Sequence, residues 1–439
     1  MIKQLMAGTG KLMITPPFDC ELSGFVARES RCRGVHDPLY SRALVLADGK
    51  GKIALVSADL IGVDAKLLAK VREKVAELTD LDPSAVVLSA THTHSGPVTL
   101  ADAFLGETDL TYLSGLINNI AGAVYQASQN LEPVSLFLGE GDCRSVGKNR
   151  RQKDGPIDPQ VLVLRLQGAD RPKALLINYA CHPVVLGPDN LLVTADYPFY
   201  MTNSLEQVYP GTQIMFVNGA AGDVNVGHRT VDSIKGKRND RRTFREAERL
   251  GRILAGVALT ASENAVLQSS FNIRYTTQEI CLPFEQVGTV DFYRQEAETW
   301  NQLAFELKRK GASFGEYRQA EVWEKWALKM TKLRQANKIE SEFKTEIATF
   351  SLGEIEFATL PGEFFHEFSL MLKKERAPRQ VVILGYTNNN IGYVTTKSVY
   401  DEGGYEVNDS YRYYGLPSRF ARGTGEEIVR ILLTMLNKL

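Results

Sequence analysis

Three of the six histidines stand where an apolar run of the sequence ends. His92 and His94 follow the run at 85–89, and His182 follows the run at 174–178. Because side chains alternate along extended backbone, a spacing of two puts His92 and His94 on the same side of the chain. Two such imidazoles, a distant histidine and a carboxylate would make the open site that catalytic zinc prefers, where the metal activates water. Taken alone, a His-x-His pair indicates hydrogen-bonded core histidines at least as strongly.

Other polar segments also follow apolar runs. They are 218–225, 361–363 and 385–393. In open α/β sheets ligands bind beyond the carboxyl ends of strands, so we expect these segments and the three histidines to share one site. The segment 219–222 is glycine-rich, but it lacks the Lys and Ser/Thr of a phosphate-binding P-loop, and we interpret it as a tight turn.

Short apolar runs and amphipathic patterns alternate along the chain, which indicates an α/β fold with a parallel or mixed sheet and flanking helices. Strands are predicted at 52–57, 85–89, 161–166, 174–178, 214–217, 355–359 and 381–384. Helices are predicted at 67–78, 113–124, 250–261 and 428–435. The charged region at 290–336 has two helical stripes around Gly311, which predicts a helical hairpin packed on the core, with a cover over the active site as the alternative.

Composition argues against several function classes. The net charge is -1 and no long Lys/Arg block is present, so we expect neither a nucleic-acid partner nor stable membrane insertion. No run reaches the 18 apolar residues of a membrane span, and the start has no signal-peptide pattern. The five cysteines are scattered without CxxC spacing, which is typical of reduced thiols and predicts a cytoplasmic protein.

Several motifs together resemble the neutral/alkaline, non-lysosomal ceramidases. In the order of that family they are Thr91–Pro97 (THTHSGP), Asn149-Arg150, Gly222–Val224 (GDV), Pro361–Glu363 (PGE) and Gly392–Thr396 (GYVTT). The resemblance covers nearly the whole chain, and it implies one ceramidase-like catalytic domain over 1–439 with the hairpin at about 290–336 as an insertion. We expect neither a counterpart of the family's immunoglobulin-like C-terminal domain nor a secretion signal.

The resemblance implies roles for individual residues. One zinc ion per chain would be held by His92, His182, Glu363 and Tyr393. His94 would lie just outside the metal shell and hydrogen-bond the reacting group, and Arg150 would contact the substrate or transition state. A phenol ligand is unusual for zinc, and without the motif Tyr393 would be interpreted as a core aromatic.

One departure bears on the chemistry. The family has a serine where this sequence has Asn225. An amide cannot act as a hydroxyl nucleophile, although it can donate a hydrogen bond, so we expect metal-activated water and keep Asn225 as an oxyanion or substrate contact. Ceramide lies in membranes and no basic amphipathic helix is evident, which favours a substrate more soluble than ceramide.

The sequence therefore predicts a zinc-dependent hydrolase that cleaves an N-acyl amide by metal-activated water. A metal-dependent esterase or lactonase is an alternative, and so is a non-catalytic metal- or ligand-binding protein. Three aspartates are left with two interpretations each. Asp59, Asp196 and Asp223 either orient ligand histidines or cap helices. Structural roles are expected for His36, His228, His366 and Cys181. The hairpin and the basic loop at 228–242 are expected to shape the pocket.

Overall fold

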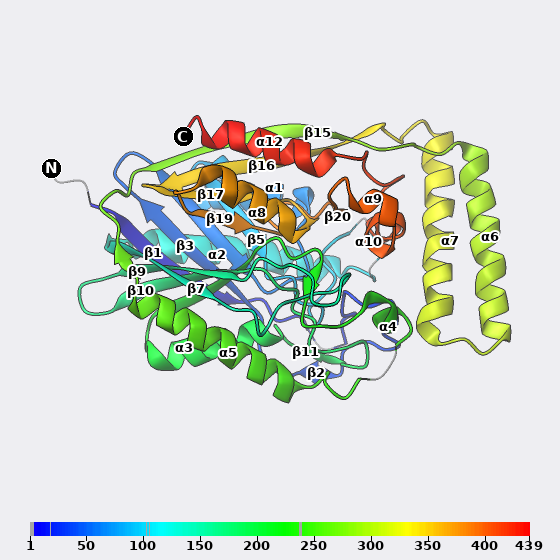
Figure 1. Ribbon diagram of the computed structural model, residues 1–439, viewed down its shortest axis with the longest axis horizontal. Coiled ribbons are helices and arrows are strands. Elements are labelled where there is room, and N and C mark those ends of the chain that lie inside the picture. The colour runs from blue at the N-terminus through cyan, green and yellow to red at the C-terminus, as the bar shows by residue number, and fades with distance from the viewer. Residues whose placement is uncertain (1–3, 18, 102, 105, 237–238) are drawn as a thin grey trace.

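Three β-sheets with helices on their outer faces form the body of the protein (Figure 1). The computed structural model describes residues 4–439 except 18, 102, 105 and 237–238. The architecture is the predicted mixed α/β fold, and each strand and helix predicted from the sequence is present with ends shifted by a few residues.

The first sheet has the strand order β5-β4-β3-β1-β6. Its strands are β1 (Met6–Met13), β3 (Tyr40–Ala47), β4 (Lys52–Ala58), β5 (Val86–Ala90) and β6 (Glu132–Pro133). Only β4 and β5 pair in parallel. Helices α1 (Ala65–Leu78) and α2 (Leu110–Gln129) pack against each other, and α2 packs on β1 and β3. Every residue of β5 is buried, so the loop that follows it begins inside the protein.

The second sheet has the order β12-β10-β9-β7-β14 and is covered by a pair of helices. Its strands are β7 (Ser135–Asp142), β9 (Gln160–Gln167), β10 (Pro172–Tyr179), β12 (Gln213–Asn218) and β14 (Val266–Leu267). Strands β10 and β12 are parallel. Helices α3 (Tyr197–Val208) and α5 (Phe244–Glu263) pack against each other, and α5 contacts β7 and β9.

The third sheet has the order β15-β16-β17-β19. Its strands are β15 (Ile273–Pro283), β16 (Glu342–Leu352), β17 (Ile355–Thr359) and β19 (Val381–Leu384), and the last two are parallel. Helices α8 (His366–Arg376) and α12 (Thr424–Leu436) pack against each other over this sheet.

The same topology recurs in the three sheets. In each, an antiparallel strand pair leads through a helix to a strand parallel to the second member: β3-β4-α1-β5, β9-β10-α3-β12 and β16-β17-α8-β19. The last strands of the three units approach one another, with contacts between β5 and β12 and between β12 and β19. The carboxyl ends of the parallel strands from different sheets therefore meet in the middle of the molecule.

The predicted helical hairpin is present as α6 (Val290–Arg309) and α7 (Phe314–Gln335), with Gly311 at φ +71° in the turn. The two helices lie side by side at one end of the molecule (Figure 1). Trp326 on α7 is fully buried, and its indole N–H donates to the carbonyl of Leu416, which fixes the hairpin to the body. No helix in the described ranges has both the length and the hydropathy needed to span a bilayer.

Short elements complete the chain around the centre. Three two-stranded pairs are β2 (Gly34–Val35) with β11 (Leu192–Val193), β8 (Lys148–Asn149) with β13 (Val224–Asn225), and β18 (Glu363–Phe364) with β20 (Tyr393–Val394). The short helices are α4 (Thr230–Ile234), α9 (Val399–Glu402), α10 (Tyr405–Asn408) and α11 (Ser410–Tyr413). A 3-10 turn occupies Pro83–Ala85.

Candidate metal centre and pocket

The predicted site residues around the metal come from the carboxyl ends of strands in all three sheets. His92 and His94 follow β5, His182 follows β10, and Glu363 opens β18 shortly after β17. The parallel pair β18 and β20 aligns Glu363 with Tyr393. His92 and Glu363, which are 271 positions apart, are thus adjacent because the three topological units meet at their strand ends.

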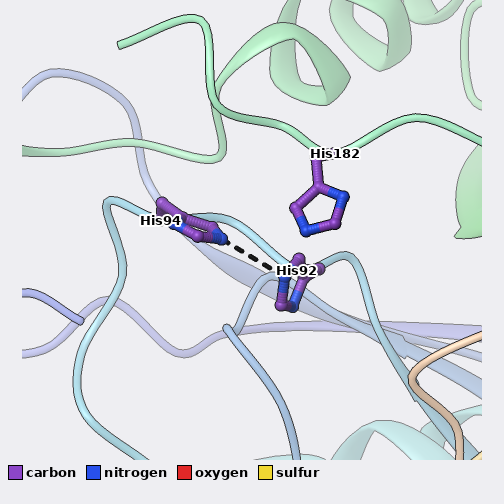
Figure 2. Close-up of side chains that lie close together, drawn as sticks. All are labelled: His92, His94 and His182. Carbon is purple, nitrogen blue, oxygen red and sulfur yellow. Dashed lines mark hydrogen bonds between the residues drawn. The ribbon is translucent and has the colours of Figure 1, made fainter. Parts of the chain in front are cut away.

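The three histidines point toward one another (Figure 2). Their ligand atoms all lie within 4.8 Å of one another, and the Nε2 atoms of His92 and His94 are 3.2 Å apart. Glu363 closes the group, because its Oε2 lies 2.9 Å from Nε2 of His182 and 3.3 Å from Nε2 of His92. The side chains of His92, His182 and Glu363 are at most 2% exposed.

The outer ring nitrogen of each histidine faces a backbone carbonyl. A carbonyl only accepts hydrogen bonds, so in each neutral ring Nδ1 carries the hydrogen and Nε2 keeps its lone pair. Three lone pairs and a carboxylate oxygen then face one another, an arrangement that could hold a cation at its centre. The accepting carbonyls belong to Ile61, Gly24 and Ala221, at 2.6, 3.1 and 2.6 Å from His92, His94 and His182.

The donor set fits a zinc ion. Zn–N and Zn–O bonds of about 2.0–2.1 Å in a tetrahedron put neighbouring ligand atoms about 3.3 Å apart. The separations of 3.2, 3.3 and 2.9 Å among His92, His94, His182 and Glu363 lie close to that value. His94 lies beside these ligands, and its place inside or outside the metal shell stays a prediction.

Burial sets the protonation of the site. Desolvation lowers the pKa of His182 to about 4, although the neighbouring Glu363 opposes it. Desolvation also lowers the pKa of His94 well below its usual value, helped by His92 and His182. Burial alone would raise the pKa of Glu363, but the neighbouring His92 and His182 outweigh it and lower the pKa. Neutral imidazoles and an ionised carboxylate are the forms that bind a metal.

The backbone around the ligands is held in unusual conformations. His92 has φ +72°, a left-handed conformation that costs a non-glycine residue free energy and that clusters at functional sites. The ring of Tyr386 stacks on that of His92 at 4.1 Å between centroids. A Cβ on Gly24 would lie 2.5 Å from the His94 ring. Gly24 is therefore required both by its φ of +96° and by the contact with His94.

A pocket of about 600 Å³, its open mouth included, leads to this cluster. Five of the seven predicted site residues line it, and His92 and Glu363 lie buried behind them. Much of the remaining wall is apolar or aromatic. The predicted residues in the wall are His94, Arg150, His182, Asn225 and Tyr393, and apolar or aromatic neighbours are Phe25, Val26, Val184, Ile234, Tyr405 and Tyr413.

Arg150 is fixed in the wall by an ion pair that the sequence did not predict. Its Nε donates to Oε1 of Glu406 at 3.0 Å, and Arg151 binds the other oxygen of that carboxylate at 2.6 Å. Nη2 of Arg150 lies 2.9 Å from Glu406 Oε1 but lacks the alignment of a hydrogen bond, so it is a buried donor without an acceptor among the described residues. The guanidinium also lies 5.2 Å from the ring centroid of Tyr393.

Tyr393 lines the pocket beside Glu363 and Arg150. Burial raises the pKa of its phenol well above the usual value, Arg150 opposes that shift and Glu363 adds to it. The phenol is therefore neutral at neutral pH unless a cation is bound nearby. Its predicted role as a ligand stays a prediction.

Asn225 lines the pocket, but its side chain also shapes its own loop. Its Oδ1 accepts from the backbone N–H groups of Gly227 and His228, and its Nδ2 donates to the carbonyl of His228 at 2.7 Å. Among the described residues, Nδ2 of Asn225 donates no second hydrogen bond. The loop at 228–242 lines the pocket through Thr230, Ser233 and Ile234, which confirms the prediction that it shapes the cavity.

The hairpin bounds a neighbouring pocket instead. That second pocket shares Phe25, Val26 and Tyr413 with the first, and α7 supplies Phe314, Arg318 and Val322 to it. Among the described residues that line the metal-site pocket, none belongs to α6 or α7. The hairpin therefore packs on the body of the protein, as predicted, and does not cover the metal-site pocket.

The three aspartates have helix-capping or structural roles. Asp196 caps α3 by accepting from the N–H of Tyr197, and Asp59 binds Arg42 at 2.8 Å. Asp223 accepts from both the backbone N–H and Nδ1 of His366 at the start of α8. Backbone carbonyls rather than these carboxylates orient the ligand histidines.

The other histidines and Cys181 lie outside the metal-ligand group. His36 stacks on Phe244, and His228 is buried in the loop that follows Asn225. Cys181 is fully buried in an apolar cluster, as predicted for a core filler.

Three residues that contact the site residues were not predicted from the sequence. Tyr414 donates a short hydrogen bond to Oε1 of Glu363, and the hydroxyl of Tyr386 lies 3.5 Å from Nδ1 of His182. Glu406 pairs with Arg150. Tyr386 follows the apolar run at 381–384, and only this position in the sequence could have marked it as a site residue. Tyr414 and Glu406 lie in short helical turns without a sequence pattern.

Fold and site together define an α/β protein with a buried cluster of three histidines and a glutamate, which could hold a metal ion, at the base of a pocket. Residues 5–231 match the family described as neutral/alkaline non-lysosomal ceramidase, N-terminal, which is more than half of the chain. The chain therefore belongs to that family.

Individual relatives agree with this membership. The chain is similar to the neutral ceramidase of Pseudomonas aeruginosa, with 28% identity over 219 residues, 44% of this chain and 32% of that protein. The similarity to the neutral ceramidase of Mycobacterium tuberculosis is 22% over 455 residues, 88% of this chain and 71% of that protein. The crystal structure of the P. aeruginosa enzyme shares the fold, with a TM-score of 0.74 at 18% identity, over 99% of this chain and 74% of that one.

The chain matches only part of the length of this relative. The alignment to the P. aeruginosa protein spans about a third of that relative's length. The family match ends before Glu363 and Tyr393, for which the structural likeness supports the fold alone.

Proposed function

We propose that this chain is a metal-dependent hydrolase that cleaves the amide bond of an N-acyl substrate, with zinc as its metal. The observation that carries the proposal is the convergence of three imidazole nitrogens and a carboxylate oxygen at the base of a pocket whose wall also holds an unsatisfied arginine donor. Membership of the ceramidase family supports the choice of an amide bond.

In this proposal His92, His182 and Glu363 hold the ion, with Tyr393 as the fourth ligand. Zinc, when bound, would supply a Lewis acid that polarises a carbonyl and lowers the pKa of water. The second oxygen of Glu363 stays engaged by Tyr414, which holds the carboxylate in one orientation.

Arg150 acts on the reacting carbonyl. Its Nη2 donates to no described residue with hydrogen-bond geometry, so a substrate oxygen in the pocket would receive a hydrogen bond that becomes stronger as negative charge develops. Glu406 and Arg151 hold the guanidinium still, so the donor is in place before the reaction begins.

His94 serves as a neutral proton acceptor at Nε2. Its Nδ1 is bound to the carbonyl of Gly24, and its lowered pKa leaves Nε2 unprotonated at neutral pH. Asn225 offers its remaining amide N–H to the substrate. Because much of the wall is apolar or aromatic, it suits the hydrocarbon part of an acyl group.

The test is a hydrolysis assay with zinc-loaded protein on matched amide and ester pairs, from short N-acyl amines to ceramides. We expect release of the free acid from amides, with Arg150→Ala lowering kcat about 100-fold or more. Arg144→Ala is the matched control, because that arginine is 70% exposed and should leave kcat unchanged. Zinc-loaded protein that cleaves esters alone would contradict the amide assignment. Preferred cleavage of ceramides would contradict the prediction of a more soluble substrate.

A further inference from the structure

Cys20 and Cys32 form a close pair of thiols outside the metal centre. Their Sγ atoms are 3.4 Å apart, and the backbone N–H of Cys32 donates to the carbonyl of Cys20 at 2.8 Å. A disulfide needs an S–S distance of about 2.05 Å, which small rotations of the two side chains can supply once the backbones are this close. No other two cysteine sulfurs in the described part of the chain are within hydrogen-bonding distance.

Both cysteines are buried, at 8% and 3% exposure for Cys20 and Cys32, but of the two only Cys20 lines a pocket. Cys20 lies in the wall of a surface pocket of about 600 Å³, beside Glu21, Arg31 and Tyr112. Cys32 is 3% exposed and is not among the residues that line this pocket. A small reactant that enters the pocket therefore meets Cys20 first and finds Cys32 directly behind it.

The segment between the cysteines belongs to the metal-site pocket. Gly24 accepts the hydrogen bond from His94, and Phe25 lines the pocket. Arg28 donates to the carbonyl of His94 at 2.9 Å and to those of Leu22 and Ser23. A covalent bond between Cys20 and Cys32 would close this loop at its base.

We propose that Cys20 and Cys32 form a reversible disulfide by exchange with a low-molecular-weight disulfide such as oxidised glutathione. The thiolate of Cys20 attacks one sulfur of glutathione disulfide, which breaks that S–S bond and releases one glutathione thiolate. Cys32 then gives its proton to solvent and attacks the Cys20 sulfur, which releases the second glutathione thiolate. Two protein thiols are oxidised and one disulfide reagent is reduced to two thiols, so electrons balance.

The environment of Cys20 sets how fast this exchange runs. Burial and the neighbouring Cys32 raise the pKa of Cys20 to about 12. The reactive thiolate is therefore scarce at neutral pH, and the exchange rate should rise about tenfold for each pH unit between 7 and 9. This proposal does not depend on the hydrolase function, because the disulfide is detected by mass and not by enzymatic activity.

The experiment uses the full chain with Cys281→Ser, which removes the exposed thiol. The folded protein is incubated with oxidised glutathione at pH 8.5, quenched with an alkylating agent, and analysed by intact mass and peptide mapping. We expect a mass loss of about 2 Da and a peptide that links Cys20 to Cys32. Thermal unfolding should move upward by a few degrees on oxidation, because the disulfide constrains the unfolded chain.

Single substitutions separate the two steps. In Cys32→Ser the second step is impossible, so glutathione should stay attached to Cys20. In Cys20→Ser no adduct should form on Cys32, because it is not reached from the pocket. Overturning results would be two free, alkylatable thiols after overnight treatment of the folded Cys281→Ser protein, or a stable glutathione adduct on Cys20 while Cys32 is present. If Cys20→Ser or Cys32→Ser prevents folding, the Cys281→Ser protein alone tests whether the disulfide forms.

Discussion

Replacing Glu406 by glutamine should destabilise the protein more than an ordinary surface substitution does. The carboxylate is 4% exposed and lies between the guanidinium groups of Arg150 and Arg151, whose side chains are 7% and 18% exposed. Glutamine keeps the shape and one acceptor oxygen but removes the negative charge, so two largely buried cations face a neutral group. Removing one partner of a buried ion pair costs about 3–5 kcal/mol, and we expect a loss in that range.

The assay is urea unfolding followed by far-UV circular dichroism, with the free energy of unfolding extrapolated to water. The control is Glu402→Gln, because Glu402 also pairs with Arg151, at 3.3 Å, but is 65% exposed. An exposed pair of this kind contributes at most about 1 kcal/mol. If Glu406→Gln lost no more stability than Glu402→Gln, the inference that this ion pair fixes Arg150 would be wrong.

Three further changes test the surroundings of the site. Gly24→Ala should cost more than Gly49→Ala, because both have positive φ but only the first meets an imidazole ring; urea unfolding should separate them by about 1 kcal/mol or more. Tyr414→Phe removes the hydroxyl that binds Glu363 and should weaken zinc binding about 10-fold, measured by competition with a chelator; an unchanged affinity would contradict the role. Burial lowers the pKa of His366, but its aspartate partner outweighs burial and raises it. A raised folded pKa gives stability that is complete below about pH 6.5 and is lost as pH rises through the folded pKa, so His366→Gln should cost more unfolding free energy at pH 6 than at pH 9. An equal cost at both pH values would contradict that assignment.

The sequence predicts most of the buried strands because their signal is local, but β3 was not predicted although all its residues except Tyr40 are buried. Strand β5 is a continuous apolar run, and such a run marks a strand buried on both faces. Strand β15 was missed because its exposed and buried residues do not form an apolar run, and β16 begins with exposed residues. The recurrence of one topology in three sheets leaves no repeat in the sequence, since different side chains satisfy the same strand pairing.

Some residues of the site could be predicted from the sequence and others could not. His92, His94 and His182 could be found because each follows a recognisable strand, and the resemblance to a family added Glu363 and Tyr393. Contacts such as the one between Tyr414 and Glu363 join segments 51 residues apart through tertiary packing. No local pattern specifies them, because a tyrosine in a short turn has the same sequence signature whether or not it reaches a ligand.

The central claim is that His92, His182 and Glu363 hold one metal ion, and metal analysis tests it most directly. The protein would be purified without chelator, loaded with zinc, dialysed and measured by mass spectrometry of the element, with circular dichroism as the check on folding. We expect about one zinc per chain in the wild type and in His36→Ala, whose ring stacks on Phe244 away from the cluster. We expect little zinc in folded His92→Ala, His182→Ala and Glu363→Ala. A folded wild type that holds no zinc after loading, or variants that keep a full equivalent, would contradict the account.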